Sequence, residues 1–247
     1  MSYRIKLPPK KSMVDEAQLM GGMERLWFAM EDHRRGLLAG LAVLILAGLM
    51  VGGVVWYDLQ QAQRALDIHL EANRFYATRP AGKPEVAANN LKEAIKRYRQ
   101  VAKEFPRSAA APHALYQLGL SLEQDNNFPG AVEAYEDLAS TYGNTGPLLG
   151  LVYQRLGYAH LNDGKTDKAI EAFTWVLAVP QALNKDQSLF ELGKLELDAS
   201  RPEAAFNHFQ AIVDDYPQSP FANDARVRIK ALEAPETETA SPPQKEQ

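Results

Sequence analysis

Three stretches that repeat one another constrain the fold more than any other feature of the sequence. Each contains a Leu-Gly pair, at residues 118–119, 156–157 and 192–193. An alanine follows thirteen residues after each leucine, and an aromatic residue follows four positions later: Ala131 and Tyr135, Ala169 and Phe173, Ala205 and Phe209. Successive alanines lie 38 and 36 residues apart. Periods of this length indicate a small structural unit that stacks on copies of itself.

The small residues at fixed positions have a physical reason. Two antiparallel helices approach closely only where their contacting side chains are small, so we expect the glycine and the alanine to meet. The aromatic residue is expected to fill the space between neighbouring repeats. Turn-forming residues such as Asn126-Asn127, Asp163-Gly164 and Arg201-Pro202 separate the two halves of each copy. Because one helix pair cannot bury its apolar face alone, the pattern predicts an all-α solenoid.

The pattern resembles the tetratricopeptide repeat, whose units carry a large residue, Leu-Gly, Ala, an aromatic residue and Pro. A partial unit comes first, with Ala94, Tyr98 and Pro106 in place but no Leu-Gly pair; its first helix is expected at about Gln60 to Thr78. A terminal capping helix is expected at Ser219 to Ala234. Position eleven of the unit, which usually holds Tyr in this family, holds Leu122, His160 and Glu196 in the three copies.

Residues 36–56, GLLAGLAVLILAGLMVGGVVW, contain no ionisable side chain. As a helix they reach roughly 32 Å, close to the ~30 Å hydrocarbon thickness of a bilayer. A cleavable signal sequence has an apolar region of only about 7–15 residues, close to the start of the chain. We therefore predict one uncleaved transmembrane helix, with a cleaved leader as the alternative.

Basic residues near the two ends of this segment predict its orientation. Among the twenty residues after Trp56, the only Lys or Arg residues are Arg64 and Arg74. The residues before the segment contain Arg4, Lys6, Lys10, Lys11, Arg25, Arg34 and Arg35. By the positive-inside rule the N-terminus stays in the cytoplasm. The prediction is a single-pass protein of the bacterial inner membrane whose repeats lie in the periplasm or another extracytoplasmic space.

The chain therefore divides into five predicted segments. Residues 1–35 form a cytoplasmic arm with a short amphipathic helix, and residues 36–56 form the transmembrane helix. Residues 57–84 form a linker helix and loop, and residues 85–233 form the repeats with their capping helix. Residues 234–247, rich in Glu, Thr, Pro and Gln, are expected to be a disordered tail.

Composition excludes several classes of function. The chain has no cysteine, which excludes thiol catalysis and cysteine-ligated metals, and its net charge of −4 disfavours nucleic-acid binding. No HExxH zinc motif, Gly-x-Ser-x-Gly elbow, Walker loop or dinucleotide fingerprint is present. The histidines have no metal-binding spacing: His33, His69, His113, His160 and His208. We predict a non-enzymatic protein without catalytic residues, metal or cofactor.

The resemblance implies a concave groove lined by the first helix of each pair, in which a peptide segment lies. Its members place groove residues at positions 2, 5, 9, 12 and 13 of the unit. Carried onto this sequence, these positions include His113, Tyr116, Leu120, Gln154, Tyr158, Leu161, Phe190, Lys194 and Leu197. We expect an aromatic and aliphatic groove with few charges that binds apolar segments, and no carboxylate clamp. The alternative is that these side chains pack against a neighbouring loop or the capping helix.

Two glycine pairs in the apolar segment have the small-xxx-small spacing that lets transmembrane helices approach closely: Gly36 with Gly40 and Gly48 with Gly52. They form a candidate docking face for another membrane protein. The alternative is that glycine is simply common in such helices.

The order of these parts, with the stretch WFAMEDHRRGLL at residues 27–38, resembles the ancillary subunit of the bacterial SecYEG translocon. The resemblance implies partnership with the translocon, with a membrane-anchored periplasmic chaperone and with exported proteins. FPRSAAAPHALYQLG (105–119) and YPQSPFANDA (216–225) also resemble envelope repeat proteins of outer-membrane assembly and cell-division coordination. The hypotheses are a translocon-associated adaptor and chaperone, or a structural scaffold of an envelope, division or secretion complex. Homo-oligomerisation stays open.

Overall fold

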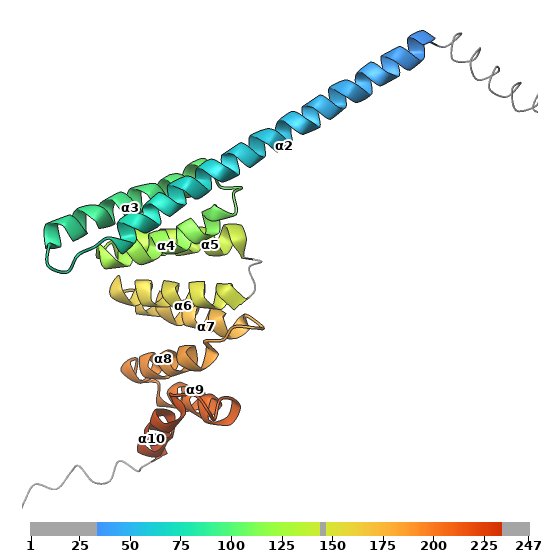
Figure 1. Cartoon of the computed structure of the whole chain (residues 1–247). Coiled ribbons are helices and arrows are strands. Elements are labelled where there is room, and N and C mark those ends of the chain that lie inside the picture. Colours follow the sequence, from blue (N-terminus) through green and yellow to red (C-terminus); the bar gives the residue numbers. More distant parts are fainter. Residues whose placement is uncertain (1–33, 144–146, 234–247) are drawn as a thin grey trace, which may run out of the picture. The chain divides into compact units, whose positions relative to one another are not determined.

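A computed structural model describes residues 34–143 and 147–233, and every regular element in these ranges is an α-helix (Figure 1). The chain divides into two compact units, Met1–Gln60 and Gln61–Gln247. The helices are α2 (Arg34–Ala77), α3 (Pro84–Glu104), α4 (Ala110–Gln124), α5 (Phe128–Tyr142), α6 (Pro147–Asn162), α7 (Thr166–Ala178), α8 (Lys185–Asp198), α9 (Pro202–Asp215) and α10 (Ala222–Glu233). The prediction of an all-α fold is confirmed.

In the first unit, the described residues are the N-terminal part of α2. This part holds the apolar run, and its side chains are exposed along the whole of residues 34–60. By length and composition α2 is long and apolar enough to cross a membrane. The boundary predicted at residue 57 falls inside α2, because no helix-breaking residue separates the apolar run from the sequence that follows it. The predicted cytoplasmic arm lies almost entirely outside the described residues.

In the second unit, successive helices from α3 to α10 pack against their neighbours along the chain and build a stack of antiparallel pairs (Figure 1). The last part of α2, from Gln61, pairs with α3 through side-chain contacts. Tyr98 donates a hydrogen bond to Asn73 (2.6 Å), and Arg97 forms a salt bridge with Glu71 (2.9 Å). Four helix pairs and a final single helix therefore make up the described part of this unit.

The turn inside each of the last three pairs has the same backbone geometry. Equivalent residues adopt left-handed φ values of 57°, 74° and 58°: Asn126, Gly164 and Ser200. The next backbone N–H donates to a carbonyl five residues earlier, at 2.8, 2.9 and 2.8 Å: Asn127 to Leu122, Lys165 to His160 and Arg201 to Glu196. This is the Schellman ending of a helix, which satisfies carbonyls that the helix leaves free. The three turns thus direct the second helix back along the first in the same way.

A second kind of turn joins one pair to the next at two places. In both, an aromatic residue, Pro, a variable residue and Ser follow the end of a helix. The serine N–H donates to the aromatic residue's carbonyl, Ser108 to Phe105 at 3.0 Å and Ser219 to Tyr216 at 2.9 Å. The residue three positions beyond each serine repeats this bond to the serine carbonyl. The turn before α10 is therefore a copy of the turn before α4.

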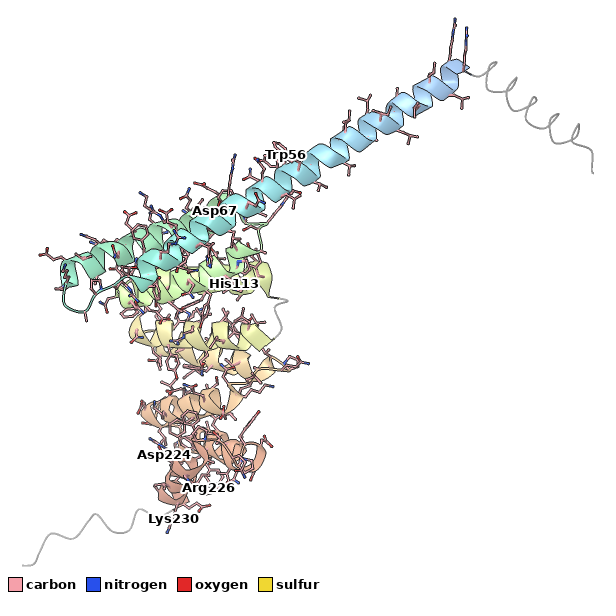
Figure 2. All side chains as sticks on the ribbon, viewed as in Figure 1. Trp56, Asp67, His113, Asp224, Arg226 and Lys230 are labelled. Atoms are coloured by element: carbon pink, nitrogen blue, oxygen red, sulfur yellow. The ribbon has the colours of Figure 1, made fainter. Side chains whose placement is uncertain are left out.

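The final helix closes the stack. α10 buries Ala222 and Ala225 against α9, whereas its outer face carries exposed polar side chains: Asp224, Arg226 and Lys230 (Figure 2). A polar outer face is what a terminal unit of a solenoid needs in water. α10 begins three residues later than the helix expected from the sequence, because Ser219, Pro220 and Phe221 belong to the turn. The predicted tail lies outside the described residues.

Candidate peptide-binding groove

The packing inside each helix pair sets the position of its first helix, and the first helices would line a groove. Gly119, Gly157 and Gly193 lie directly beneath the aromatic ring of their own pair. A Cβ atom added there would stand 2.4, 2.8 and 2.6 Å from Tyr135, Phe173 and Phe209. All three rings are fully buried, as are the alanines four residues before them. The glycine therefore leaves room for the ring of its own pair, and Phe173 also packs with Leu192 and Leu195 of the next pair.

The nine predicted groove residues differ in accessibility. His113 on α4 is exposed (Figure 2), whereas Gln154 on α6 is only 5 % exposed and Phe190 on α8 only 8 %. The other six side chains are half-buried: Tyr116, Leu120, Tyr158, Leu161, Lys194 and Leu197. They come from three successive first helices, and their assignment to a groove stays a prediction.

Phe190 packs inside the stack, at its C-terminal end. Its ring stacks on Phe221 at 5.1 Å between centroids and meets Phe209 at 5.8 Å. The Arg228 guanidinium of α10 lies over the ring at 5.3 Å. Packing against the capping region, which was the alternative to a groove position, therefore accounts for the burial of Phe190.

Between α6 and α8, polar side chains link the two first helices. The Tyr158 hydroxyl accepts a hydrogen bond from Gln187 (3.0 Å) and donates one to Glu191 (3.3 Å). Glu191 also pairs with Lys194 at 2.8 Å. Burial, with the Glu191 carboxylate as a second cause, raises the pKa of Tyr158 to about 12. The hydroxyl is therefore protonated at physiological pH and holds a fixed place between the helices.

Between α4 and α6, an ion pair takes the equivalent place. Arg155 lies 3.8 Å from Glu123, and burial raises the pKa of the Glu123 carboxyl. Arg155, Glu123 and Glu191 were not among the predicted groove residues, so the face has more charge than was expected. A signal exists nonetheless: Arg155 and Glu191 each come directly before the leucine of a Leu-Gly pair.

α2 extends the row of first helices toward the N-terminus. It faces α4 through Tyr76, whose hydroxyl accepts a hydrogen bond from Gln124 at 2.7 Å. Ala65 and Ala72 on its inner side are buried, whereas Leu66 and Leu70 are 49 % and 46 % exposed. These are the most exposed leucines on the described first helices of the second unit. Leu66 and Leu70 were not predicted as groove residues because the first pair lacks the Leu-Gly marker from which positions in the repeat are counted.

The predicted docking glycines lie in the first unit. An added Cβ atom at Gly36, Gly40, Gly48 or Gly52 would meet no atom within 4 Å. The helix surface is thus open at all four positions, and their role as a docking face stays a prediction. Within residues 34–143 and 147–233, no three His, Asp or Glu side chains gather in a group that could hold a metal ion.

The stacked helix pairs, the glycine–aromatic contacts and the capping helix define a tetratricopeptide-repeat protein. Residues 70–235, about two thirds of the chain, match the YfiO family, described as an outer membrane lipoprotein. The chain belongs to this family. Proteins with this fold generally act as non-enzymatic scaffolds that bind other proteins along extended surfaces.

Solved structures agree on the fold. A tetratricopeptide repeat protein from Parabacteroides merdae superposes with a TM-score of 0.50 at 15 % identity, over 66 % of this chain and 60 % of its own. The nearly identical repeats of a putative kinesin light chain from Podosopora anserina superpose with a TM-score of 0.50 at 15 % identity, over 68 % of this chain and 85 % of their own. No curated protein matches the chain. The repeat solenoid predicted from the sequence is thereby confirmed.

Proposed function

We propose that this protein is a single-pass scaffold of the bacterial inner membrane that binds polypeptide segments with the face formed by its first helices. Membership of a family of outer membrane lipoproteins supports a role in the cell envelope. The sequence has no cysteine, the residue that carries the lipid of a lipoprotein, so attachment falls to the apolar part of α2. The basic residues before that part support a cytoplasmic N-terminus and periplasmic repeats.

The observation that carries the proposal is the accessible surface of the first helices. Leu66 and Leu70 on α2 are about half exposed, and half-buried aromatic and aliphatic side chains follow on α4, α6 and α8. Apolar anchors presented by successive helices suit an apolar segment in helical or extended form. The ion pair between Arg155 and Glu123 and the Tyr158–Glu191 contact add polar groups that would orient such a segment.

The finer proposal is an adaptor and chaperone at the SecYEG translocon. The arrangement of arm, anchor and repeats supports it, as does the stretch at residues 27–38 that resembles the ancillary translocon subunit. In this role the glycine pairs of α2 dock beside the channel, and the repeats hold apolar segments of exported proteins or contact a membrane-anchored chaperone.

A second candidate is a structural scaffold of an envelope complex, such as the machinery of outer-membrane assembly, cell division or secretion. The YfiO match favours this reading, because its family description places relatives at the outer membrane. In this role the same face binds one fixed partner instead of many exported chains.

Co-purification of the full chain from membranes in mild detergent, followed by mass spectrometry, separates the two roles. Translocon subunits and exported proteins are expected for the adaptor, and envelope-assembly, division or secretion components for the scaffold. Replacing both Leu66 and Leu70 with Asp should lower recovery of the partner by at least about tenfold, since ~1.4 kcal/mol of lost affinity is tenfold. Val86→Asp on α3, the same change at a residue 43 % exposed, is the matched control and should leave recovery unchanged. Equal recovery with all variants would contradict the proposed binding face.

A further inference from the structure

One turn between helix pairs presents an apolar side chain to solvent. Leu183, in the turn from α7 to α8, is 90 % exposed, more than any other large hydrophobic residue in the described part of the chain. At the two other turns described between pairs, the exposed tips are polar: Arg107 before α4 and Gln218 before α10. The apolar tip is therefore peculiar to the turn after α7.

The turn that carries Leu183 is held against α6. The side-chain amide of Asn184 donates a hydrogen bond to the Gly150 carbonyl at 3.1 Å. A Cβ atom added at Gly150 would stand 2.5 Å from the Cβ atom of Ala182, so the turn packs directly on α6. The Ala182 N–H donates to the Val179 carbonyl at 3.3 Å. A fixed turn therefore directs Leu183 outward.

An apolar cleft of about 510 Å³ lies beside this turn, between the start of α6 and the end of α7. None of its described lining residues is charged, and Val179 and Pro180 belong both to the cleft and to the turn. Trp175 forms one wall and is 45 % exposed, with its ring centroid 5.3 Å from that of Tyr153. We call Trp175, Pro180 and Leu183 the apolar edge patch. Clustered apolar surface of this kind marks an interaction site more often than single exposed residues do.

The apolar edge patch lies on the edge of the second unit at which the chain enters. Successive helices of the stack alternate in direction (Figure 1), so every first helix begins at one edge and every second helix ends there. Gln61, where the unit starts, lies at that edge, together with the end of α7. Gln61 follows Trp56, the last residue of the apolar run, by five residues, which is about 8 Å along an α-helix. The inference below rests on the proposed anchoring by α2, which keeps this edge close to the membrane.

We propose that the apolar edge patch inserts into the interfacial layer of the membrane. Leucine gains free energy on leaving water, and tryptophan prefers the interface, where its ring is buried and its N–H keeps polar partners. The basic Lys185 follows the patch directly and suits anionic headgroups. The neighbouring Asp186 is engaged inside the stack, where its carboxylate accepts a hydrogen bond from Ser219 at 2.6 Å. The lipid surface thus becomes a second point of attachment for the repeats, besides α2.

Quenching of Trp175 by brominated lipid tests this contact in the full chain. The sequence contains three tryptophans, so Trp27→Phe with Trp56→Phe leaves Trp175 as the only reporter. The protein is reconstituted in vesicles of phosphatidylethanolamine and phosphatidylglycerol, with or without phosphatidylcholine brominated near the headgroup end of its acyl chains. Bromine quenches only rings that reach the bilayer, so the emission of Trp175 should fall by about half or more.

Two further reporters calibrate the result. Trp56 alone, obtained with Trp27→Phe and Trp175→Phe, reports on the anchor and should also be quenched. Lys168→Trp, with all three native tryptophans replaced by Phe, is the matched control. It places the ring two turns earlier on the same face of α7, toward the opposite edge of the stack, and should keep its emission.

A change at the tip of the turn tests the role of Leu183. Leu183→Asp places a charge in the patch and should restore most of the Trp175 emission. Val227→Asp, at a residue 68 % exposed on α10, is the control and should leave the quenching of Trp175 unchanged. Both positions are exposed, so neither substitution empties the interior. Equal quenching of Trp175 in Leu183→Asp and in the parent would remove Leu183 from the contact and overturn the inference.

The reporters separate failure of this inference from failure of the proposed function. Quenching of Trp56 without quenching of Trp175 would overturn the inference and leave the anchor in place; a protein partner that covers the patch would give this result. Equal quenching of Trp175 and of Lys168→Trp would also overturn it, because no edge of the stack would then be preferred. Absence of quenching at both Trp56 and Trp175 would contradict the anchor together with the inference.

Discussion

The interior of the helix pairs and the contacts between successive first helices follow opposite rules. Inside the three marked pairs, one arrangement recurs: a buried ring lies over a glycine, next to a buried alanine. Between first helices, every contact is different. An ion pair joins α4 to α6, a tyrosine with two polar partners joins α6 to α8, and stacked phenylalanines join α8 to the region of α10.

This difference teaches what the repeat specifies and what it leaves free. The interior has one solution because the two backbones meet there and only small residues fit. The face between first helices is set by longer side chains, which form several kinds of contact at the same spacing. Stability is therefore expected to reside mainly in the interior, and individual binding properties on the face.

The largest effect should come from emptying one interior position. Phe173→Ala removes a fully buried ring, and a substitution of this kind costs about 3–5 kcal/mol. Trp175→Ala, two residues further along the same helix, removes a larger but 45 % exposed ring and should cost far less. Urea unfolding followed by circular dichroism measures both. Similar losses for the two variants would break the distinction between interior and surface.

A smaller effect should come from filling the space beneath a ring. Gly193→Ala places a methyl group 2.6 Å from Phe209, and overpacking of this kind costs about 1–3 kcal/mol. Gly82→Ala is the control, since its added Cβ meets nothing within 4 Å. The same unfolding measurement should show a lower midpoint for Gly193→Ala alone. A stabilised Gly193→Ala would mean that helix propensity outweighs the close contact.

On the face between first helices, Tyr158→Phe should cost only about 0.5–1.5 kcal/mol, the usual net contribution of hydrogen bonds. A double-mutant cycle with Gln187→Ala isolates the 3.0 Å bond from the other contacts of the ring. We expect a coupling energy well below the loss caused by Phe173→Ala. A coupling energy of similar size would mean that a contact between first helices stabilises the fold as much as a buried interior ring does.

The smallest effect concerns pH. His160 is buried at the interior position that holds Leu122 in the preceding pair, and burial lowers the pKa of His160 below its usual 6.5. The unfolded chain then binds more protons than the folded chain at mildly acidic pH. The stability contributed by neutral His160 is therefore complete above about pH 7 and falls as the pH drops through 6.5.

His160→Leu, which copies the equivalent residue of the preceding pair, should flatten this decline. Urea unfolding at pH 7.5 and pH 5.5 gives the comparison. Burial also lowers the pKa of His208, so His208 causes its own loss of stability at acidic pH. This loss should remain in His160→Leu and serves as an internal reference. If the free energy of unfolding depends on pH identically in wild type and His160→Leu, then His160 does not contribute to the decline.

Most of the fold could be predicted because the residues that determine it recur at regular spacing in the sequence. The alanines at the marked positions are all fully buried, and the turns fall at the residues that the sequence pattern indicated. The contact between each ring and the glycine of its own pair was not predicted, since spacing alone does not tell which neighbours a ring meets. The boundary predicted at residue 57 falls inside α2, because an apolar run and an amphipathic helix join there without a helix-breaking residue.

The binding face could be predicted only in part. Phe190 has the spacing of a groove residue, yet its burial depends on Phe221 and Arg228, which are distant in the sequence. Leu66 and Leu70 lie on α2, in the helix pair that lacks the Leu-Gly marker, so the repeat pattern does not identify them as groove residues. Trp175 has no counterpart in the other copies, where Asp137 and Ala211 stand, so no pattern pointed to the cleft.

Site-specific photocrosslinking in intact membranes tests the central claim most directly. A photoreactive residue at Leu66 or Tyr158, on the face of the first helices, should capture a polypeptide partner. The same residue at Thr174, exposed on the second helix α7, should not. Mass spectrometry of the adducts names the partner. Equal capture from Thr174 and Leu66, or none from either first-helix position in a correctly inserted protein, would contradict the proposed binding face.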